Sequence, residues 1–531
     1  MKLNNKGMAI SGILYSILVL FIVLVFGLLS LLASTKYSFD KFKHDLKEKL
    51  ETLEFELVHE DYMLVTHSDL HITEQSIFNY FYPTEFSSIK TVRSMKATTI
   101  PDGAIKVTDV SKTKNNKIQS YLISREDGGY DLYIISEGLI YANYDSSLLF
   151  AEMPSVTDIT LDNFDTSATI KMTEMFYDNK ALTSVDVSKF NMTNVLYTQA
   201  MFYNCEKLTY LDVSSWDLSS AVAMGMTFYN CASLRNLDVS NWDVSKVQDM
   251  HKLFDSCKSL EVLDVSRWDT SNLTDAHHLF GSDKYYEMAL REIRGIENLN
   301  TSKVTTMYGM FFYCVNLTNL DLTRWNVSNV TNMNNMFKNC KGLTSLDLSN
   351  WNVGKVTNMA YMFDDASNII TLNLSGWDTK SVTNMISMFS NMNNVTSIAG
   401  ISNFNTSKVT SLYNVFSYCY DLASLDISNW NVSQVTNFAT MFNGMNNCTT
   451  ADLSNWVFNE SADVDRMFLN YDVDTLIVKD SAAANKIAQH LPNRTATSIG
   501  KVVINGEYSG VNLADLQALN WYVFDSSGNQ I

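Results

Sequence analysis

Proline is scarce in this sequence, and it is absent from the centre of the chain. Only 4 of the 531 residues are proline, and all of them, Pro83, Pro101, Pro154 and Pro492, lie outside residues 155–491. Proline lacks a backbone N–H and interrupts regular hydrogen bonding. Its absence leaves the long central stretch free to form one uninterrupted backbone pattern.

Positive charge is also scarce. The chain has 39 Lys and Arg against 57 Asp and Glu, a formal net charge of −18. The first 50 residues hold seven Lys and three acidic residues, so they carry +4 and the other 481 residues carry −22. This balance excludes binding to nucleic acid, whose backbone needs clustered Lys and Arg. The hydrophobic content of 46% excludes a disordered chain.

Catalytic motifs are missing from the sequence. It has no glycine-rich phosphate loop, no G-x-S-x-G elbow and no carboxylate pair with a reason to differ in pKa. His59 lacks the second histidine of a zinc-protease motif, and His277 and His278 are adjacent rather than at a metal-binding spacing. A surface role is the alternative for that pair. We expect no enzyme activity, no metal and no cofactor.

Six of the seven cysteines occupy one repeating position. Disulfides between repeats would need sulfurs that face each other, whereas a ladder points them in parallel. A zinc site would require a Cys-x-x-Cys pair, and the sequence has none. Small buried thiols fit the pattern best. The six are Cys205, Cys231, Cys257, Cys314, Cys340 and Cys419.

Residues 1–33 read as a basic leader followed by a transmembrane helix. The run from Met8 to Ala33 is 26 uncharged residues, about 39 Å as a helix, which spans a bilayer with some tilt. Signal peptidase requires a small residue at the position that Leu31 occupies, two residues before Ala33. We therefore expect the helix to be retained as a membrane anchor. The lysines that follow would place the long C-terminal part in the cytoplasm on a strict positive-inside count.

The same leader resembles the start of a type IV prepilin-like protein, in the run NNKG followed by MAISGILYSILVLFIVLV. The resemblance implies cleavage between Gly7 and Met8 and self-association through the helix. The chain departs from that family at the fifth mature position, where Gly12 replaces the usual Glu. Residues 34–57 then carry an apolar stripe, which suits either a coiled-coil stalk or a helix that packs on the next domain.

The strongest signal is an internal repeat of 26 residues, with one interval of 31 and one of 27. One column holds large apolar anchors, and a second column, twelve residues later, is Phe in every repeat. The anchors are Phe164, Phe190, Trp216, Trp242, Trp268, Leu299, Trp325, Trp351, Trp377, Phe404, Trp430 and Trp456. The second column is Phe176, Phe202, Phe228, Phe254, Phe280, Phe311, Phe337, Phe363, Phe389, Phe416, Phe442 and Phe468.

One repeat unit, residues 330–351, shows the expected local structure. Apolar residues recur every three or four positions from Val330 to Leu343, which predicts a short helix or 3₁₀ segment. Leu346 and Leu348 then alternate with polar residues, which predicts a short strand. Each unit has one apolar edge, and stacking units in register buries it. We therefore expect an α/β repeat solenoid with a parallel sheet about 60 Å long on one face.

Two repeats are irregular. Each has an extra residue near Gly295 or Gly400, where we expect a bulge or kink. The first also gains residues near Asp283 to Tyr286, which predict a protruding loop.

The runs L-T-S-L-D-L-S-N-W and W-N-V-S-N-V-T-N-M-x-x-M-F resemble the leucine-rich repeats of BspA-like bacterial surface proteins. The resemblance covers residues 139–471 and matches in the Trp, Met-Phe and Cys columns. It implies an extracellular solenoid that binds proteins or other surfaces. Residues 58–138 break the period and read as a small α+β capping module. Residues 472–531 read as a C-terminal cap, with a strand at Thr475–Val478 and a covering helix at Ser481–Leu491.

A row of aspartates supplies the candidate ligand-binding face, together with Tyr285 and Tyr286 on the predicted loop. These aspartates alternate with buried strand positions, so they should face outward. Either the row is an acidic stripe for a basic partner or a cation, or it is an ordinary solvated polar face. The row is Asp186, Asp212, Asp238, Asp264, Asp321, Asp347, Asp426 and Asp452.

The sequence predicts a single-pass protein of the cell membrane. The resemblance to surface proteins implies that its repeat domain lies outside the cell, in conflict with the positive-inside count. The leucine-rich-repeat solenoid would mediate adhesion or bind a protein or cell-surface ligand. The alternative is a minor pilin-like subunit that displays the solenoid on a filament, and an enzyme is the distant third.

Overall fold

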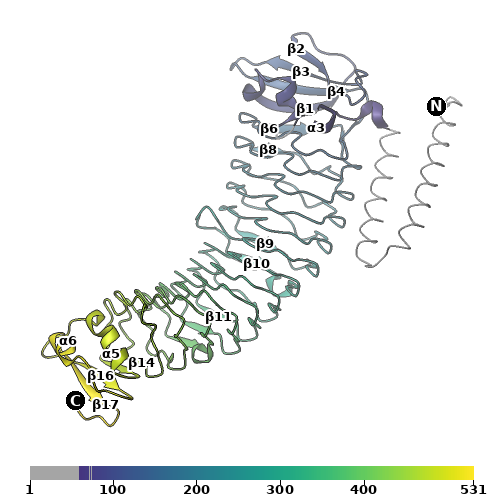
Figure 1. Ribbon diagram of the computed structural model, residues 1–531. Helices are drawn as coiled ribbons and strands as arrows, with labels where there is room; N and C mark the ends of the chain where they lie inside the picture. Colours follow the sequence, from purple (N-terminus) through teal and green to yellow (C-terminus); the bar gives the residue numbers. More distant parts are fainter. Residues whose placement is uncertain (1–58, 71, 73–74) are drawn as a thin grey trace, which may run out of the picture.

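A computed structural model describes residues 59–531 apart from 71, 73 and 74. The chain forms a long, curved solenoid with a sheet-rich module at its N-terminal end and a smaller cap at its C-terminal end (Figure 1). The predicted transmembrane helix, the stalk and the Gly7–Met8 cleavage site lie outside the described residues. Among the residues described, no helix has the length and apolarity needed to cross a membrane.

The N-terminal module is built around a six-stranded sheet in the order β2-β3-β4-β1-β6-β8. β1 pairs in parallel with β4 on one side and with β6, from the repeat region, on the other. The sheet of the module therefore continues into the solenoid. Its elements are η1 (Glu60–Tyr62), α3 (His67–Leu70), α4 (Ile77–Phe81), η2 (Phe86–Ser88), β1 (Ile89–Lys96), β2 (Ala104–Asp109), β3 (Ile118–Ser124) and β4 (Tyr130–Ser136).

One wall of the solenoid, here the strand wall, carries short parallel strands. They form separate groups, β6–β8, β9–β10, β11–β12–β13 and β14–β15–β16–β17, so the expected parallel pairing is confirmed but the sheet is interrupted. The first strands are β6 (Asp158–Leu161) and β8 (Ser184–Val185). A separate parallel pair, β5 (Ile140–Tyr141) with β7 (Phe164–Asp165), lies at the anchor column. The middle strands are β9 (Val262–Asp264), β10 (Glu292–Arg294), β11 (Ser345–Asp347), β12 (Thr371–Asn373) and β13 (Ser397–Ala399).

A second wall, the ladder wall, holds the coils together without interruption. Single parallel backbone bridges link every coil to the next, from Asp145 with Lys171 to Asn437 with Asp463. Within one coil, the N–H groups of Met333, Asn335 and Phe337 donate to carbonyls 25 residues later, at 2.8–3.0 Å. The intervening residues close turns instead. Backbone bonding along the whole array therefore runs through this wall rather than through the strand wall.

The short helix or 3₁₀ segment expected over residues 330–343 is not formed. The segment is a series of turns, in which Asn335 and Asn339 have left-handed backbones with φ of 58° and 59°. A helix needs consecutive right-handed residues, so these two positions exclude it. The sequence period misled because successive turns also return a side chain to the interior every third or fourth residue. Within residues 145–470, all of which the structure describes, the only helical pieces are the 3₁₀ turns η3 (Ile296–Asn298) and η4 (Ile401–Asn403).

The repeat columns form the core as stacked ladders. Neighbouring rings of the Phe column lie 5.1–6.3 Å apart, and Phe78 of α4 stacks on Phe150 at 5.7 Å, so the N-terminal module docks on the end of this stack. The Trp351 Nε1–H donates to the carbonyl of Leu322, 29 residues earlier, at 3.1 Å. All seven cysteines are buried free thiols, as expected. Cys340 donates to the carbonyl of Phe311 at 3.1 Å, and burial raises the pKa of its thiol.

The extra residue of each irregular coil forms a 3₁₀ turn rather than a bulge. Gly295 and Gly400, with φ of 78° and 88°, precede η3 and η4. A Cβ on Gly295 would lie 2.2 Å from the Cα of Ser266 in the preceding coil, and one on Gly400 would lie 2.4 Å from the Cα of Ser375. Both coils therefore require glycine for the backbone conformation and for the close approach.

The C-terminal region continues the path of the coils. Parallel pairing extends through β14 (Thr450–Leu453), β15 (Thr475–Val478), β16 (Gly500–Ile504) and β17 (Trp521–Asp525). The helices α5 (Ser481–Ile487), η5 (Ala488–His490) and α6 (Leu513–Ala518) replace the turns of the ladder wall. The Trp521 Nε1–H donates to the carbonyl of Pro492 at 2.9 Å, again 29 residues earlier, so the ninth tryptophan repeats the anchor bond.

Candidate functional site

The row of aspartates lies along the strand wall, each exposed or half-buried between buried neighbours. Each carboxylate accepts a hydrogen bond from the backbone N–H two residues later, as in Asp238, whose Oδ1 accepts from the Ser240 N–H at 3.1 Å and from its hydroxyl at 2.7 Å. This contact closes an Asx turn at the end of the strand position. It recurs at Asp186, Asp212, Asp264, Asp321, Asp347, Asp426 and Asp452.

In three of these turns the hydrogen bonds favour the ionised carboxylate. Hydrogen bonds from the hydroxyl and the backbone N–H of the residue two positions later lower the pKa of Asp186, Asp264 and Asp321. The row therefore has a structural role, because each carboxylate closes a turn.

The turn requires an Asx side chain, but it does not require the charge. Asn373 occupies the same position in another coil, and its Oδ1 accepts from the Ser375 N–H at 3.2 Å and from its hydroxyl at 2.7 Å. A second Asx turn follows each anchor, where Asp243 and Asn326 accept the equivalent N–H at 3.0 and 3.1 Å. Asparagine and aspartate therefore build the same corner, and the choice between them sets the surface charge.

That choice divides the solenoid into two parts. Residues 181–280, the acidic coils, contain 12 acidic and seven basic residues, a net charge of −5. Residues 301–400, the neutral coils, contain five acidic and six basic residues, a net charge of +1. The two stretches have equal length and share one coil geometry, so negative charge is concentrated in the first.

The inserted loop folds back over the ladder wall instead of hanging free. The Asp283 carboxylate accepts the Tyr229 hydroxyl at 2.7 Å and the Lys252 ammonium at 2.5 Å. The Asp283 N–H donates to the Asp255 Oδ1 at 3.0 Å. Burial opposes the ionised form of Asp283, but the bonds from Lys252 and Tyr229 outweigh it and lower its pKa. The loop is thus tied to two earlier coils.

A buried acid–histidine pair lies under this loop. Asp255 and His278 are 0% and 1% exposed, and their Oδ2 and Nδ1 atoms are 3.2 Å apart. Burial raises the pKa of Asp255. The His278 ring rests on Gly309, where a Cβ would approach its Nε2 to 2.4 Å. The surface role suggested for the histidine pair is therefore wrong for His278, whereas His277 is half-buried on the ladder wall and bonded to Asp275 at 2.7 Å.

The tip of the loop displays two tyrosines. Tyr285 is 64% exposed, has a left-handed backbone with φ of 59°, and packs edge-on against Phe312 and Tyr313 at 5.4 and 5.5 Å. The Tyr286 N–H donates to the Ser282 hydroxyl at 2.9 Å, and Tyr286 is 36% exposed. A bulky residue seldom adopts positive φ. The loop therefore holds an exposed aromatic ring in a fixed, strained position.

The structure does not bring the aspartates and the tyrosine pair together. The loop precedes strand β10, whereas the aspartates stand at the ends of strands such as β9 and β11, so the two lie on opposite edges of the strand wall. The residues that anchor the loop, Tyr229, Lys252 and Asp255, were not predicted from the sequence because they belong to earlier coils. The available signal was their position in the coils just before the insertion.

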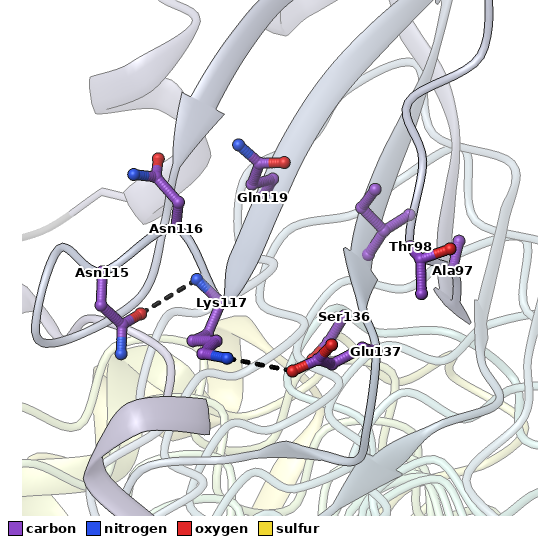
Figure 2. A pocket seen from close by; sticks show the side chains of 9 residues that line it. Ala97, Thr98, Asn115, Asn116, Lys117, Gln119, Ser136 and Glu137 are labelled. Atoms are coloured by element: carbon purple, nitrogen blue, oxygen red, sulfur yellow. Dashed lines mark hydrogen bonds and ion pairs between the residues drawn. The ribbon is translucent and has the colours of Figure 1, made fainter.

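A separate hollow lies in the N-terminal module. It has a volume of about 260 Å³ and opens beside the carboxyl ends of β1 and β4 (Figure 2). Its charged groups are Lys117 and Glu137, whose Nζ and Oε1 atoms are 3.0 Å apart. Within the described part of the chain, no cluster of three or more His, Cys, Asp or Glu side chains could hold a metal ion.

Comparison with known proteins identifies the repeats. The family model described as "Mycoplasma protein of unknown function, DUF285" matches residues 144–236, 208–292, 283–398 and 367–476, more than half of the chain. No curated protein matches the chain.

Three solved structures share low identity with the chain. TLR13 in a complex with ssRNA13 is 13% identical, with 73% of this chain and 58% of that chain covered and a TM-score of 0.19. The functional domain of InlJ from Listeria monocytogenes, which includes a cysteine ladder, is 14% identical, with 71% and 75% covered and a TM-score of 0.20. The Drosophila Toll–Spatzle complex is 14% identical, with 71% and 53% covered and a TM-score of 0.24. The chain thus spans 58% of the first of these chains. The assignment of a solenoid rests on the coil geometry described above.

Proposed function

We propose, from the premise that this chain belongs to the DUF285 family, that its repeat solenoid is a binding surface for a basic protein partner. The single observation that carries the proposal is the excess of aspartate in the acidic coils. Asparagine closes the same turns in the neutral coils, so the fold does not need that charge. A surface that carries charge beyond the needs of its fold is suited to steer and select a partner of opposite charge.

Membrane anchoring and an extracellular position form part of the proposal and rest on the sequence. The uncharged run of 26 residues from Met8 to Ala33 is long enough to span a bilayer. The protein would then present its solenoid at the cell surface as an adhesin. Protease added to intact cells should remove the repeat region, and full protection of residues 59–531 would overturn the outside orientation.

The test of the acidic surface replaces charge without altering the turns. In the variant, Asp212, Asp238 and Asp264 become asparagine. Titration calorimetry at two salt concentrations measures the binding of an oligolysine peptide. Binding should weaken about fivefold, because each lost ion pair contributes a few tenths of a kcal/mol and the effects add. The salt dependence of binding should fall with it.

The matched control variant changes the same number of aspartates elsewhere in the row. Asp321, Asp347 and Asp426 become asparagine, which removes equal charge from coils outside the acidic stretch. Binding should change by less than about twofold. An equal loss in both variants would mean that the peptide senses net charge alone, and the acidic coils would no longer be the proposed site.

Tyr285 is proposed as a second contact, at the other edge of the strand wall. Rigid, exposed tyrosines dominate many protein interfaces because little conformational entropy is lost when they bind. Tyr285→Ala should weaken binding to a natural partner, whereas Tyr508→Ala, which removes a tyrosine 47% exposed in the C-terminal region, should not. The ligand for this measurement is a partner recovered by cross-linking on intact cells. If that partner binds the Tyr285→Ala and Tyr508→Ala variants with equal affinity, Tyr285 is not part of the site.

The alternative, a pilin-like subunit, makes a distinct prediction. Mass spectrometry of the mature protein would find Met8 as the first residue, because the leader would be cut after Gly7. An intact Met1 would exclude that assembly route and leave the membrane-anchored form.

A further inference from the structure

The hollow in the N-terminal module lies apart from the repeat surface. β1 and β4 are adjacent parallel strands, and the hollow opens where both end, at Ala97 and at Ser136–Glu137. The loop that leads into β3, residues 115–117, forms its other side (Figure 2). Loops at the ends of rigid strands are where binding groups are commonly placed.

Its charged rim is fixed and electrically balanced. Glu137 accepts the Tyr62 hydroxyl at 2.6 Å and pairs with Lys117 at 3.0 Å, and these two bonds lower the pKa of its carboxyl group. Asn115 accepts the Lys117 N–H at 2.9 Å and donates to the Asp61 carboxylate at 2.9 Å. The rim is therefore rigid, and its one cation and one anion neutralise each other.

Two amide side chains remain unused on the lining. Asn116 and Gln119 both line the hollow, and within the described residues neither amide has a hydrogen-bond partner. Asn116 is held by its left-handed backbone, with φ of 61°, and by its N–H, which donates to the Asp109 Oδ2 at 2.9 Å. Each amide presents an NH2 donor group and a carbonyl acceptor side by side in one plane. The hydroxyls of Thr98 and Ser136 add further polar groups.

We propose that this hollow binds one unit of a neutral sugar. Adjacent hydroxyls on a sugar ring offer a donor and an acceptor side by side, which matches the amides of Asn116 and Gln119. The balanced Lys117–Glu137 pair gives no preference for an ionised ligand. A volume of about 260 Å³ suits one ring rather than a larger molecule.

The expected affinity is low, on the order of 1 mM, because no aromatic ring lines the hollow to stack on the sugar. This site does not depend on the proposed protein-binding surface, since it lies outside the repeat. Either proposal can fail without the other.

The experiment is ligand-observed NMR on the full-length chain, in a detergent without a sugar headgroup. The probes are glucose, galactose and mannose, with glucosamine and glucuronate as charged analogues. At least one neutral hexose should give saturation transfer at concentrations of about 1–10 mM. Asn116→Gly, which keeps the positive φ, and Gln119→Ala should each weaken binding about tenfold, because each removes two hydrogen bonds.

Asn335→Gly is the matched control, since Asn335 has φ of 58° on the ladder wall and lies far from the hollow in sequence. It should leave sugar binding unchanged. Circular dichroism shows whether each variant is folded, and Gln119→Thr replaces Gln119→Ala if that variant is not folded. The proposal fails if no neutral hexose binds the folded protein at about 10 mM, if the two pocket variants bind as well as wild type, or if a charged analogue binds about tenfold more tightly than every neutral sugar.

Discussion

The acidic coils and the neutral coils share one backbone but differ in charge. Trp242 and Trp351 occupy the same place in each, both 1% exposed, and both donate to a carbonyl 29 residues earlier at 3.1 Å. Around this common core, residues 181–280 carry −5 and residues 301–400 carry +1. The periodic core fixes the coil, while the Asx corners accept either aspartate or asparagine. Charge can therefore vary along the array at little cost to the fold.

The largest expected effect tests whether the two cores are equivalent. Trp242→Ala and Trp351→Ala should each lower the free energy of unfolding by about 3–5 kcal/mol, because each leaves a cavity and an unpaired buried carbonyl. Denaturant unfolding followed by circular dichroism measures both. Losses that differ by more than about 2 kcal/mol would break the equivalence of the two stretches.

A smaller effect is expected where a coil depends on one glycine. Gly400→Ala should destabilise the protein by about 2 kcal/mol or more, because its φ of 88° disfavours a Cβ and that atom would clash with the preceding coil. Gly354→Ala is the control, since Gly354 lies in a regular coil where the nearest atom to a new Cβ would be the Asn352 Oδ1 at 3.2 Å. Thermal melts compare them, and equal stability of the two variants would contradict the strained turn.

The Asx corners should respond to shape rather than to charge. Asp238→Ala should cost about 0.5–1 kcal/mol, because the Ser240 N–H loses its acceptor, whereas Asp238→Asn should be close to neutral. Asp347→Ala should cost a similar amount, since its Oδ1 accepts the Ser349 N–H at 3.0 Å. Chemical unfolding of the three variants checks this, and a costly Asp238→Asn would show that the charge itself stabilises the coil.

Acid should slightly weaken the Asx corners of both stretches. The folded-state pKa values of Asp186, Asp217 and Asp264 are lowered by hydrogen bonds from serine hydroxyls and backbone N–H groups. A lowered pKa contributes stability above the ordinary value of 3.8, and that contribution is lost as the pH falls through the folded value. Asp255 acts in the opposite direction, because burial raises its pKa.

The measurement compares wild type with a variant in which Asp186, Asp217 and Asp264 are asparagine. Any advantage of wild type in melting temperature at about pH 7 should shrink by about pH 3, because the carboxyl groups are then protonated. The same comparison in the neutral coils, with Asp321 and Asp378 changed to asparagine, should have the same sign, because their pKa values are also lowered. A wild-type advantage that grew on acidification would contradict the sign.

The last prediction is that two buried thiols, one in each stretch, do not react in the native protein. Cys231 and Cys340, one in each stretch, are fully buried, and burial raises the pKa of both thiols. Iodoacetamide should therefore leave both unmodified in the native protein and modify both after unfolding. Peptide mass spectrometry locates the label. Faster labelling of Cys231 under native conditions would show that the acidic coils open locally more often than the neutral ones.

The repeat could be predicted from sequence because its columns are visible without a structure. The Phe and Trp columns, the buried thiols and the outward aspartates follow from a period of 26 residues and from strand alternation. The ladder wall could not be predicted in the same way. Its left-handed residues, such as Asn335 and Asn339, share a side-chain period with a helix, and only the backbone distinguishes the two. The period therefore gave the right core and the wrong local structure.

The anchoring of the insertion was also beyond sequence reasoning. Asp283 contacts Tyr229 and Lys252, which precede it by 54 and 31 residues. Spacings of this size carry no meaning until the coils are stacked. The same stacking explains the aspartate row, because only the hydrogen bond from the residue two positions later reveals the turn that each carboxylate closes.

The sequence by itself determined that this protein stacks repeated coils around ladders of Phe and Trp, because a regular apolar period can be buried in only one register. It also determined where the negative charge lies, since that depends on composition alone. The tertiary structure decided how the coils are joined, which aspartates serve the backbone, and where Tyr285 is displayed. Those features depend on backbone conformation and on contacts between coils, and both arise only when distant segments are brought side by side.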